Sequence, residues 1–285
     1  MSRIGDSVMP GAAGLSEFQR TAGRIRAHVL QMACAARAPH VASSLSCVDI
    51  LVALYFHILR IDPQKPSDPM RDRFILSKGH ACSAQYATLA ERGFFPVELL
   101  REYARNGGRL AEHPGPSCVP GIEAATGSLG HGLPIGVGLA YAARLRRQAS
   151  RVFVLLSDGE CHEGSVWEAA MYAPAQRLDN LVVIVDDNKW SALQRSRAPM
   201  ALDPLAEKWV AFGWQAVEVD GHDGSALLAA LERIPREPAR PTVVIAHTVK
   251  GKGVSFMEDD LEWHYRPPTA DEVDRAFHEL GLDPS

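Results

Sequence analysis

In the second half of the chain, apolar runs alternate with stretches that have helical periodicity. The runs predict strands and the stretches between them predict helices, in the order strand 151–157, helix 165–177, strand 181–186, helix 205–212, strand 215–219, helix 225–233 and strand 242–247. Such alternation is typical of right-handed strand–helix–strand units around a parallel sheet. The runs are nearly continuous in Val, Ile and Leu, which indicates strands covered on both faces. We therefore expect an α/β fold with a doubly wound, mostly parallel sheet and helices on both faces.

The first half of the chain is richer in helix. Helices are expected at 17–38, 46–59, 81–92 and 133–144, with one short strand at 74–77. Residues 107–132 are dense in Gly, Pro and Ser, and a loop of that length inside a compact domain is usually functional. Because no clear linker divides the 285 residues, we expect one domain at 16–285 after a flexible N-terminal arm at 1–15.

The overall composition argues against several classes of protein. A formal net charge of −4 and the lack of a basic stripe give no reason to expect nucleic-acid binding. No run reaches about eighteen apolar residues, so a membrane span is not expected. The five cysteines show no CxxC or CxxH spacing, which indicates reduced thiols in a cytoplasmic protein; they are Cys34, Cys47, Cys82, Cys118 and Cys161.

Polar residues follow two of the predicted strands directly. Asp158 and Gly159 end the first strand of the second half, and Asn188 follows the next strand about thirty residues later. Parallel strands would bring both side chains to one edge of the sheet, where ligands bind in folds of this class. A carboxylate and an amide oxygen suit a hard cation such as Mg²⁺, with the Trp190 carbonyl as a third ligand, and Gly159 would let the backbone approach a phosphate.

Neighbouring carboxylates offer alternatives for the metal. Asp186 and Asp187 lie at the end of the same strand as Asn188, but residues of this type at a strand end are more often turn and cap residues. An Asp-Gly pair alone is also a common turn. The interpretation therefore depends on the combination of Asp158 with Asn188 at the correct separation.

Six segments together resemble the diphosphate-binding half of transketolase. They run in this order: SKGHACSAQYATLAERGFF, PGIEAATGSLGHGLPIGVGLA, SDGECHEGSVWEAAM, LDNLVVIVDDNKW, FGWQAVEVDGHD and TVKGKGVSFMEDD. The match extends from about Phe18 to Thr269 and looks most like the separate N-terminal subunit of the split bacterial transketolases. The resemblance implies thiamine diphosphate as cofactor, held through Mg²⁺ or, in its place, Ca²⁺ or Mn²⁺.

The resemblance also assigns roles to histidines. His40 matches a histidine that faces the substrate, and His113 matches one close to the substrate carbonyl. His80 and His264 match histidines that contact both the diphosphate and the substrate. Each could instead be an ordinary hydrogen-bonded residue, but imidazoles are well suited to moving protons between sugar hydroxyls.

Further positions follow from the same resemblance. Gly127, Ser128 and Leu129 match the backbone segment that receives the aminopyrimidine ring, and Glu160 is grouped with Asp158 and Gly159 as a cofactor-binding residue.

Other histidines and lysines have weaker assignments. His131, His222 and His247 are expected to be structural. His131 occupies a place where the family often has Gln, so a contact with the cofactor is its less favoured alternative. Lys250 and Lys252 could offset the charge of a diphosphate, or could lie on a solvated loop.

The family resemblance implies a partner. The glutamate that activates the cofactor and the arginines that bind a sugar phosphate belong to the pyrimidine-binding domain, and no residue of this chain matches them. We therefore expect an α2β2 heterotetramer with a C-terminal transketolase subunit that carries the pyrimidine domain. This assembly would transfer a two-carbon ketol unit between sugars, which are expected to be sugar phosphates.

Two alternatives remain open at the level of sequence. One is a subunit of another thiamine diphosphate enzyme, either a 2-oxo acid dehydrogenase or a deoxyxylulose-phosphate synthase-like protein. The other is a non-catalytic regulatory subunit that keeps the fold. Departures from the family pattern, among them Tyr265 after the last histidine and Ser157 before Asp158, bear on the sugar more than on the cofactor.

Overall fold

A parallel sheet forms the centre of the molecule. The computed structural model describes residues 12–115 and 118–283, and within them five strands pair in the order β1-β2-β3-β5-β4. Their bounds are β1 (Arg73–Leu76), β2 (Val152–Ser157), β3 (Leu181–Asp187), β4 (Gln215–Asp220) and β5 (Thr242–His247). Every neighbouring pair is parallel. The predicted α/β class is confirmed, and all five predicted strands are present within a residue or two of their expected bounds.

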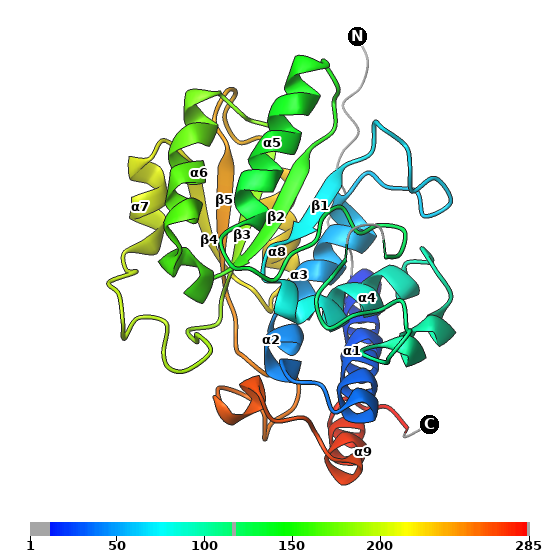
Figure 1. Ribbon diagram of the computed structural model, residues 1–285. Helices are drawn as coiled ribbons and strands as arrows, with labels where there is room; N and C mark the ends of the chain where they lie inside the picture. Colours follow the sequence, from blue (N-terminus) through cyan, green and yellow to red (C-terminus); the bar gives the residue numbers. More distant parts are fainter. Residues whose placement is uncertain (1–11, 116–117, 284–285) are drawn as a thin grey trace.

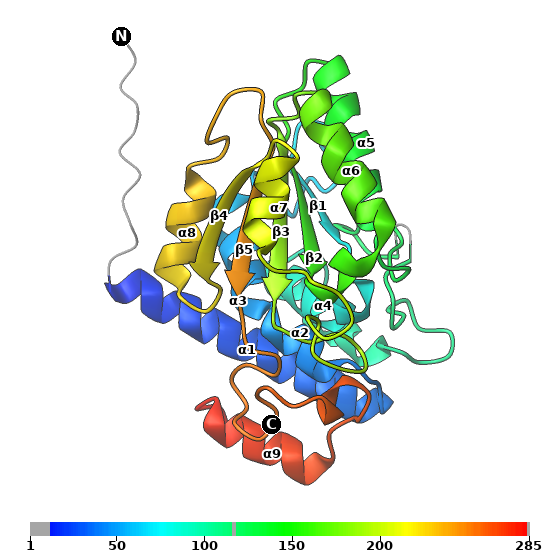
Figure 2. The same cartoon turned by 90° about the vertical axis from the view of Figure 1, so that its left-hand side faces the viewer.

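Helices cover both faces of the sheet (Figures 1 and 2). Successive residues of a strand point to opposite faces: Phe153 and Leu155 of β2 join one apolar cluster, and Val154 and Leu156 join the other. Helices α1 (Ala12–Ala36), α3 (Val48–Ala53), α4 (Cys82–Glu91) and α8 (Gly224–Glu232) contribute to the first cluster. Helices α5 (Gly132–Leu145), α6 (Gly164–Ala175) and α7 (Leu205–Ala211) contribute to the second. The sheet is therefore doubly wound, as predicted.

Several elements differ from the sequence prediction. The pattern predicts an irregular stretch before Ser46, but this stretch contains the short helix α2 (Val41–Ser46), and the helix expected at 46–59 is α3 followed by a π-helical turn, η1 (Leu54–Ile58). Among the elements without a counterpart in the prediction are the 3₁₀ segment η3 (Val97–Glu102) and the amphipathic helix α9 (Ala270–Glu279).

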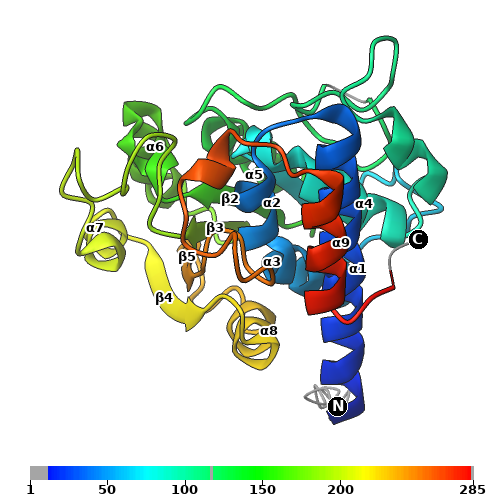
Figure 3. The ribbon, with the colours of Figure 1, turned by 90° about the horizontal axis from the view of Figure 1, so that it is seen from below.

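The chain ends add two further observations. Helix α9 starts with a capping box in which Thr269 and Glu272 satisfy each other's backbone N–H groups, and it lies alongside α1 (Figure 3). At the other end, α1 begins at Ala12, inside the predicted N-terminal arm, and residues 1–11 of that arm lie outside the described residues.

Two general expectations can be compared with the structure. In the described ranges, no helix is long and apolar enough to cross a lipid bilayer. The five cysteines are all free thiols.

The strands end at the same level, which decides where the functional residues lie. Ser157 of β2 is paired with Asp186 of β3, and Asp187 of β3 is paired with His247 of β5. All strands run in the same direction, downward in Figure 2, so their carboxyl ends share one edge of the sheet. Figure 3 looks toward this edge and shows α2 and the segment that precedes α9 lying across it.

Helix α5 packs very closely on the sheet because it carries glycine at the contact. A Cβ atom on Gly136 would lie 2.4 Å from Cγ2 of Val154, a buried side chain of β2. Gly138, half a turn further on, has nothing within 4 Å of the corresponding position and is exposed. The two glycines of one helix therefore have opposite requirements.

Replacing each of these glycines with alanine should change stability in opposite directions. Gly136→Ala should lower the free energy of unfolding by about 1–2 kcal/mol, because overpacking outweighs the gain in helix propensity. Gly138→Ala should raise it by about 0.5–1 kcal/mol, because alanine favours the helix and meets no neighbour. Chemical denaturation of both variants tests the packing, and equal effects would contradict it.

Candidate functional site

The carboxyl ends of β2 and β3 bring the three predicted metal ligands together. Asp158 follows β2 and Asn188 follows β3, and the Asp158 N–H donates to the carbonyl of Asp186 at 3.2 Å. A Cβ atom on Gly159 would lie only 3.3 Å from Cα of Ser191 and 3.6 Å from the carbonyl oxygen of Trp190. Glycine at this position thus lets the loop after β3 pass directly beside the end of β2.

The two carboxylate oxygens of Asp158 have different surroundings. Oδ2 accepts hydrogen bonds from the Ser196 hydroxyl and from Nη1 of Arg197, the latter at 2.8 Å. Oδ1 is buried and has no hydrogen-bond partner among the described residues. A buried carboxylate oxygen without a partner is unfavourable, so this atom is well suited to a cation.

Burial and neighbouring charges also shift the pKa of Asp158. Burial raises the pKa of Asp158 to about 7, and the nearby Asp187 charge adds to this, while the Ser196 hydrogen bond and Arg197 oppose it. A divalent cation at Oδ1 would stabilise the ionised carboxylate, since an opposite charge favours the charged form.

Asn188 is held with its amide oxygen on a defined side. Its Nδ2 group donates to Oγ of Ser46 at 3.2 Å and to Oδ2 of Asp186 at 3.4 Å. Its Oδ1 atom accepts the Trp190 N–H at 3.1 Å and keeps a second lone pair. Oδ1 of Asp158, Oδ1 of Asn188 and the Trp190 carbonyl oxygen, the three predicted ligands, are oxygen atoms of the kind that Mg²⁺, Ca²⁺ and Mn²⁺ prefer.

The alternative carboxylates are already engaged by protein donors. Asp186 is wholly buried and forms an ion pair with Lys78, with a further hydrogen bond from Thr248. Asp187 pairs with Lys189 and Arg197. Both residues therefore have structural contacts, but as ion-pair partners at the end of β3 and not as the turn or cap residues expected from the sequence.

A cavity of about 200 Å³ lies beside these ligands. The four predicted histidines line it together with residues from both strand ends; the lining residues are His40, Ser43, His80, His113, Gly127, Leu129, Ser157, Gly159, Asn188, Trp190, Ser191, Ala192 and His264. These histidines come from four widely separated segments of the sequence, and the fold gathers them into one pocket.

The four imidazole rings form a compact cluster around His40. The centroid of its ring lies 4.8 Å from that of His264, 5.2 Å from that of His80 and 6.2 Å from that of His113. The Nδ1 atom of His40 is buried and has no hydrogen-bond partner among the described residues.

His40 owes its position to an unusual backbone conformation. It has φ 70° and ψ 16°, in the left-handed region, and its N–H donates to the carbonyl of His264 at 2.7 Å. This turn before α2 directs the ring toward the cavity. A non-glycine residue in this conformation carries strain that often marks a functional position.

Burial keeps three of the histidines neutral. Burial lowers the pKa of His40 to about 4, with the His113 charge as the next cause, and lowers that of His264 to about 3, with Lys250 as the next cause. Burial followed by the Lys78 charge holds the pKa of His80 well below its usual range. Neutral imidazole can both donate and accept a hydrogen bond, so near neutral pH these rings can exchange protons with a hydroxyl group in either direction.

The glycine-rich loop is anchored against the same edge of the sheet. Thr126 donates its hydroxyl to the Leu76 carbonyl at 2.6 Å, and a Cβ atom on Gly79 would lie 2.5 Å from the carbonyl carbon of Thr126. Gly127, with φ 143°, leaves space for the His113 ring because it has no side chain. A Cβ atom at this position would lie only 2.6 Å from Cδ2 of His113. The loop expected to be functional thus places His113 at the cavity.

Three predicted cofactor residues do not line the cavity in the described part of the chain, and one of them is Asp158, which is wholly buried next to the lining residue Gly159. Ser128 is exposed and lies between Gly127 and Leu129, which do line it. Glu160 is wholly buried and accepts hydrogen bonds from the Gly130 N–H at 2.8 Å and from the Ser77 hydroxyl. Glu160 therefore supports the glycine-rich loop, and any effect it has on a cofactor would pass through that loop.

Two buried lysines lie close to residues of the site. The sequence prediction leaves the role of Lys250 undecided and misses Lys78. Lys250 is buried and its Nζ lies 2.9 Å from Nδ1 of His264; burial lowers its pKa to about 8, with the Lys78 charge as the next cause. Lys252 does not line the cavity, and its Nζ lies 3.5 Å from Oε1 of Glu258. Lys78 is absent from the predicted set, although its place beside His80 in the SKGH segment is a signal that could have located it.

The remaining histidines are held by protein groups. His222 lies between the Asp49 carboxylate at 2.7 Å and the Val249 N–H at 2.8 Å, and His247 contacts Asp187 and Glu218. His131 is exposed, with Nδ1 3.1 Å from the carbonyl of Leu129. The structural roles expected for His222 and His247 fit these contacts.

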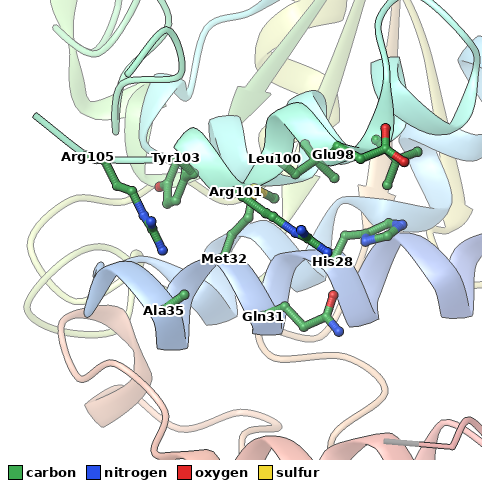
Figure 4. Close-up of a pocket in the computed structure, with 10 residues that line it drawn as sticks. His28, Gln31, Met32, Ala35, Glu98, Leu100, Arg101, Tyr103 and Arg105 are labelled. Carbon is green, nitrogen blue, oxygen red and sulfur yellow. The ribbon is translucent and has the colours of Figure 1, made fainter. Parts of the chain in front are cut away.

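A larger cavity, of about 350 Å³, lies elsewhere, between α1 and η3 (Figure 4). His28 and Gln31 of α1 face Arg101 and Tyr103 across it. Within the described ranges, none of the predicted site residues lines it. Size alone therefore does not identify the functional site, whereas the chemistry of the lining residues does.

Comparison with known proteins identifies the family. The model of the family described as transketolase, thiamine diphosphate binding domain, matches residues 18–285. The chain belongs to the transketolase family. The resemblance noted in the sequence is thereby confirmed, together with thiamine diphosphate as the cofactor of the family's domain.

Relatives of similar length are named as separate transketolase subunits. A subunit of the apulose-4-phosphate transketolase of Phocaeicola vulgatus is 40% identical over 255 residues, covering 90% of each chain. The 6-deoxy-6-sulfo-D-fructose transketolase subunit SqwG of a Clostridium species is 39% identical over 264 residues, covering 93% of this chain and 96% of the relative.

A solved transketolase shares the fold over a longer chain. The crystal structure of a transketolase mutant from Pichia stipitis superposes with a TM-score of 0.90 at 30% identity, covering 95% of this chain but 41% of that one. The chain therefore spans about two fifths of the length of this transketolase.

Asp158→Ala should abolish Mg²⁺-dependent binding of thiamine diphosphate, because it removes a buried carboxylate oxygen that no donor of the described residues occupies. Calorimetric titration of the full chain, with its partner subunit when that is needed for binding, measures the loss. Asp274→Ala, the same substitution at an exposed position of α9, should retain binding. Unchanged affinity in Asp158→Ala would remove the metal assignment.

Proposed function

We propose that the chain is the diphosphate-binding subunit of a two-chain transketolase, which transfers a two-carbon ketol unit from a ketose to an aldose. The observation that carries this proposal is the shared location of two sets of groups. Asn188, Trp190 and the four histidines line a single cavity at the carboxyl edge of the sheet, and Asp158, whose Oδ1 has no partner among the described residues, lies in sequence between the lining residues Ser157 and Gly159.

The residues of this chain have separate tasks in the proposed reaction. Thiamine diphosphate, when bound, supplies a nucleophilic thiazolium carbon that can carry the two-carbon unit. Asp158 and Asn188 would hold the cation that neutralises the diphosphate, and buried Lys250 would add positive charge beside His264. This arrangement fixes the cofactor at one end and leaves the imidazoles free to act on the sugar.

The histidines are positioned to handle protons of the sugar hydroxyls. The free Nδ1 atom of His40, which has no partner among the described residues, can accept a hydrogen bond from a hydroxyl in the cavity. His113 approaches from the glycine-rich loop and is exposed, which suits a residue that meets the reacting carbonyl as the substrate enters. Because the pKa values of His40, His80 and His264 lie below their usual range, these rings add no positive charge near neutral pH.

The proposed assembly is an α2β2 heterotetramer with a C-terminal subunit that carries the pyrimidine domain. Support comes from the two relatives that are named as separate subunits and match this chain over nearly their whole length. The partner would bring the activating glutamate and the phosphate-binding arginines, which match no position in this chain.

The substrates are proposed to be anionic sugars. One relative is named for apulose 4-phosphate and another for 6-deoxy-6-sulfofructose, so a phosphate or a sulfonate at the far end of the sugar is the common chemistry. The proposed location is the cytoplasm, where five free cysteines would remain reduced.

Activity should depend on the partner. Ketol transfer from xylulose 5-phosphate to ribose 5-phosphate, with Mg²⁺ and thiamine diphosphate, should be seen only when this chain is mixed with the product of the neighbouring gene. Apulose 4-phosphate and sulfofructose extend the panel of donors. If the cofactor is bound in the mixture but no sugar of the panel reacts, the proposed activity is wrong.

His113→Ala should reduce kcat for ketol transfer by about 10²-fold or more, the usual contribution of a positioned acid–base group, while cofactor affinity stays close to wild type. His131→Ala is the matched control, since His131 is exposed on the same loop and its ring lies beside the Leu129 carbonyl. Steady-state kinetics and a cofactor titration separate the two effects. A fall in cofactor affinity would place His113 in the cofactor site instead.

A further inference from the structure

We propose that Arg197 is a positioning residue that holds the Asp158 carboxylate so that a single oxygen is presented to the cation. This proposal deepens the function proposed above and rests on it. It is carried by the contacts of the Arg197 guanidinium, which joins three carboxylates from separate parts of the fold.

One edge of the guanidinium is fixed from the outside. Nη2 lies 3.0 Å from Oδ1 of Asp203, and Nε lies 3.2 Å from its Oδ2, so Asp203 and the planar guanidinium form a bidentate pair. Asp203 is at the end of the loop that follows β3, and its side chain is 65% exposed. This pairing sets the plane and direction of the guanidinium without using Nη1.

The remaining nitrogen, Nη1, points at the strand ends. It donates to Oδ2 of Asp158 at 2.8 Å and also to Oδ1 of Asp187. Both carboxylates are wholly buried, while the Arg197 side chain is 22% exposed. The Arg197 guanidinium therefore bridges two buried carboxylates. Asp158 follows β2 and Asp187 ends the neighbouring strand β3, so their mutual repulsion would be strong without a cation between them.

The two carboxylate oxygens of Asp158 therefore have different roles. Nη1 of Arg197 and the Ser196 hydroxyl both bind Oδ2, so this oxygen cannot rotate away without losing two donors. Oδ1 has no donor among the described residues and is left for the cation. A metal ligand oriented in this way meets the strict geometry of Mg²⁺ better than a freely rotating carboxylate would.

A lysine cannot replace this arrangement. Arg197→Lys keeps the positive charge, but a single ammonium group cannot hold Asp203 as a fork while it bridges Asp158 and Asp187. The substitution thus separates geometry from charge, and Asp158 should become free to rotate. Because Mg²⁺ requires near-ideal octahedral geometry and Ca²⁺ tolerates irregular sites, this loosening should weaken Mg²⁺ more than Ca²⁺.

The experiment measures the relative affinity for the two ions. Mn²⁺ is bound to the full chain with thiamine diphosphate, together with the partner subunit, and is displaced with Mg²⁺ or Ca²⁺ while electron paramagnetic resonance reports free Mn²⁺. Arg197→Lys should shift the affinity ratio toward Ca²⁺ by about five- to tenfold, given the stricter geometry of Mg²⁺. Arg240→Lys, which changes an arginine paired with Glu237 at the opposite end of the strands, should leave the ratio unchanged.

The possible outcomes distinguish positioning from a merely structural role. A lower melting temperature in the absence of metal, with an unchanged ion ratio, would show that Arg197 only anchors the loop and would overturn the proposal. If Arg197→Lys fails to fold, Asp203→Asn removes the fork from the exposed side and should shift the ratio in the same direction by a smaller factor; no shift would overturn the proposal. Failure of the wild-type chain to show an Asp158-dependent Mn²⁺ site would instead contradict the proposed function as well.

Discussion

The parallel pairing of β2 with β3 is the interaction on which the rest of the site depends. Ser157 lies opposite Asp186 in this ladder, so the two strands end within a residue or two of each other. Asp158 and Asn188 are therefore delivered to the same place by backbone hydrogen bonds, before any side chain is considered. A shift of the register would separate the carboxylate from the amide and also move Gly159 away from the Trp190 carbonyl, which it approaches closely.

Around this edge the molecule brings buried charges together and compensates them in pairs. Lys78 pairs with Asp186, and Arg197 bridges Asp158 and Asp187. Such pairs are poor contributors to stability, because removing ions from water offsets much of their attraction. Their value here is geometric: the compensated carboxylates hold their neighbours in place, and one oxygen of Asp158 is left without a partner among the described residues. His40 reaches the same cavity through a turn in the left-handed region and His113 through the glycine-rich loop, while His80 and His264 lie in the short 3₁₀ segments Gly79–Ala81 and Glu262–His264.

Much of this can be predicted from the sequence, for physical reasons that differ between elements. The buried strands β2, β3 and β5 appear as nearly continuous apolar runs and are predictable for that reason. The edge strand β4 has no buried residue and is predictable from its place in the alternation of strands and helices. Helix α2 is not, because Ser-rich segments have weak helix propensity and this one is stabilised by burial of all its residues. Helix α9 is missed although Thr269 and Glu272 form a capping box, a signal that could have located its start. The meeting of Asp158 and Asn188 at one edge of the sheet is predictable from spacing, whereas the place of Arg197 is not, since only the folded loop brings it beside Asp158.

The central claim, that the strand ends present one shared oxygen site for a divalent cation, is tested most directly by locating the cation. Crystals of the full chain with its partner subunit, grown with Mn²⁺ and thiamine diphosphate, would give an anomalous difference peak at the metal. We predict a single strong peak at about 2.1 Å from Oδ1 of Asp158, Oδ1 of Asn188 and the Trp190 carbonyl oxygen, as for a small divalent ion with oxygen ligands. A peak coordinated by Asp186 or Asp187, with Asp158 left bound only to Ser196 and Arg197, would contradict it.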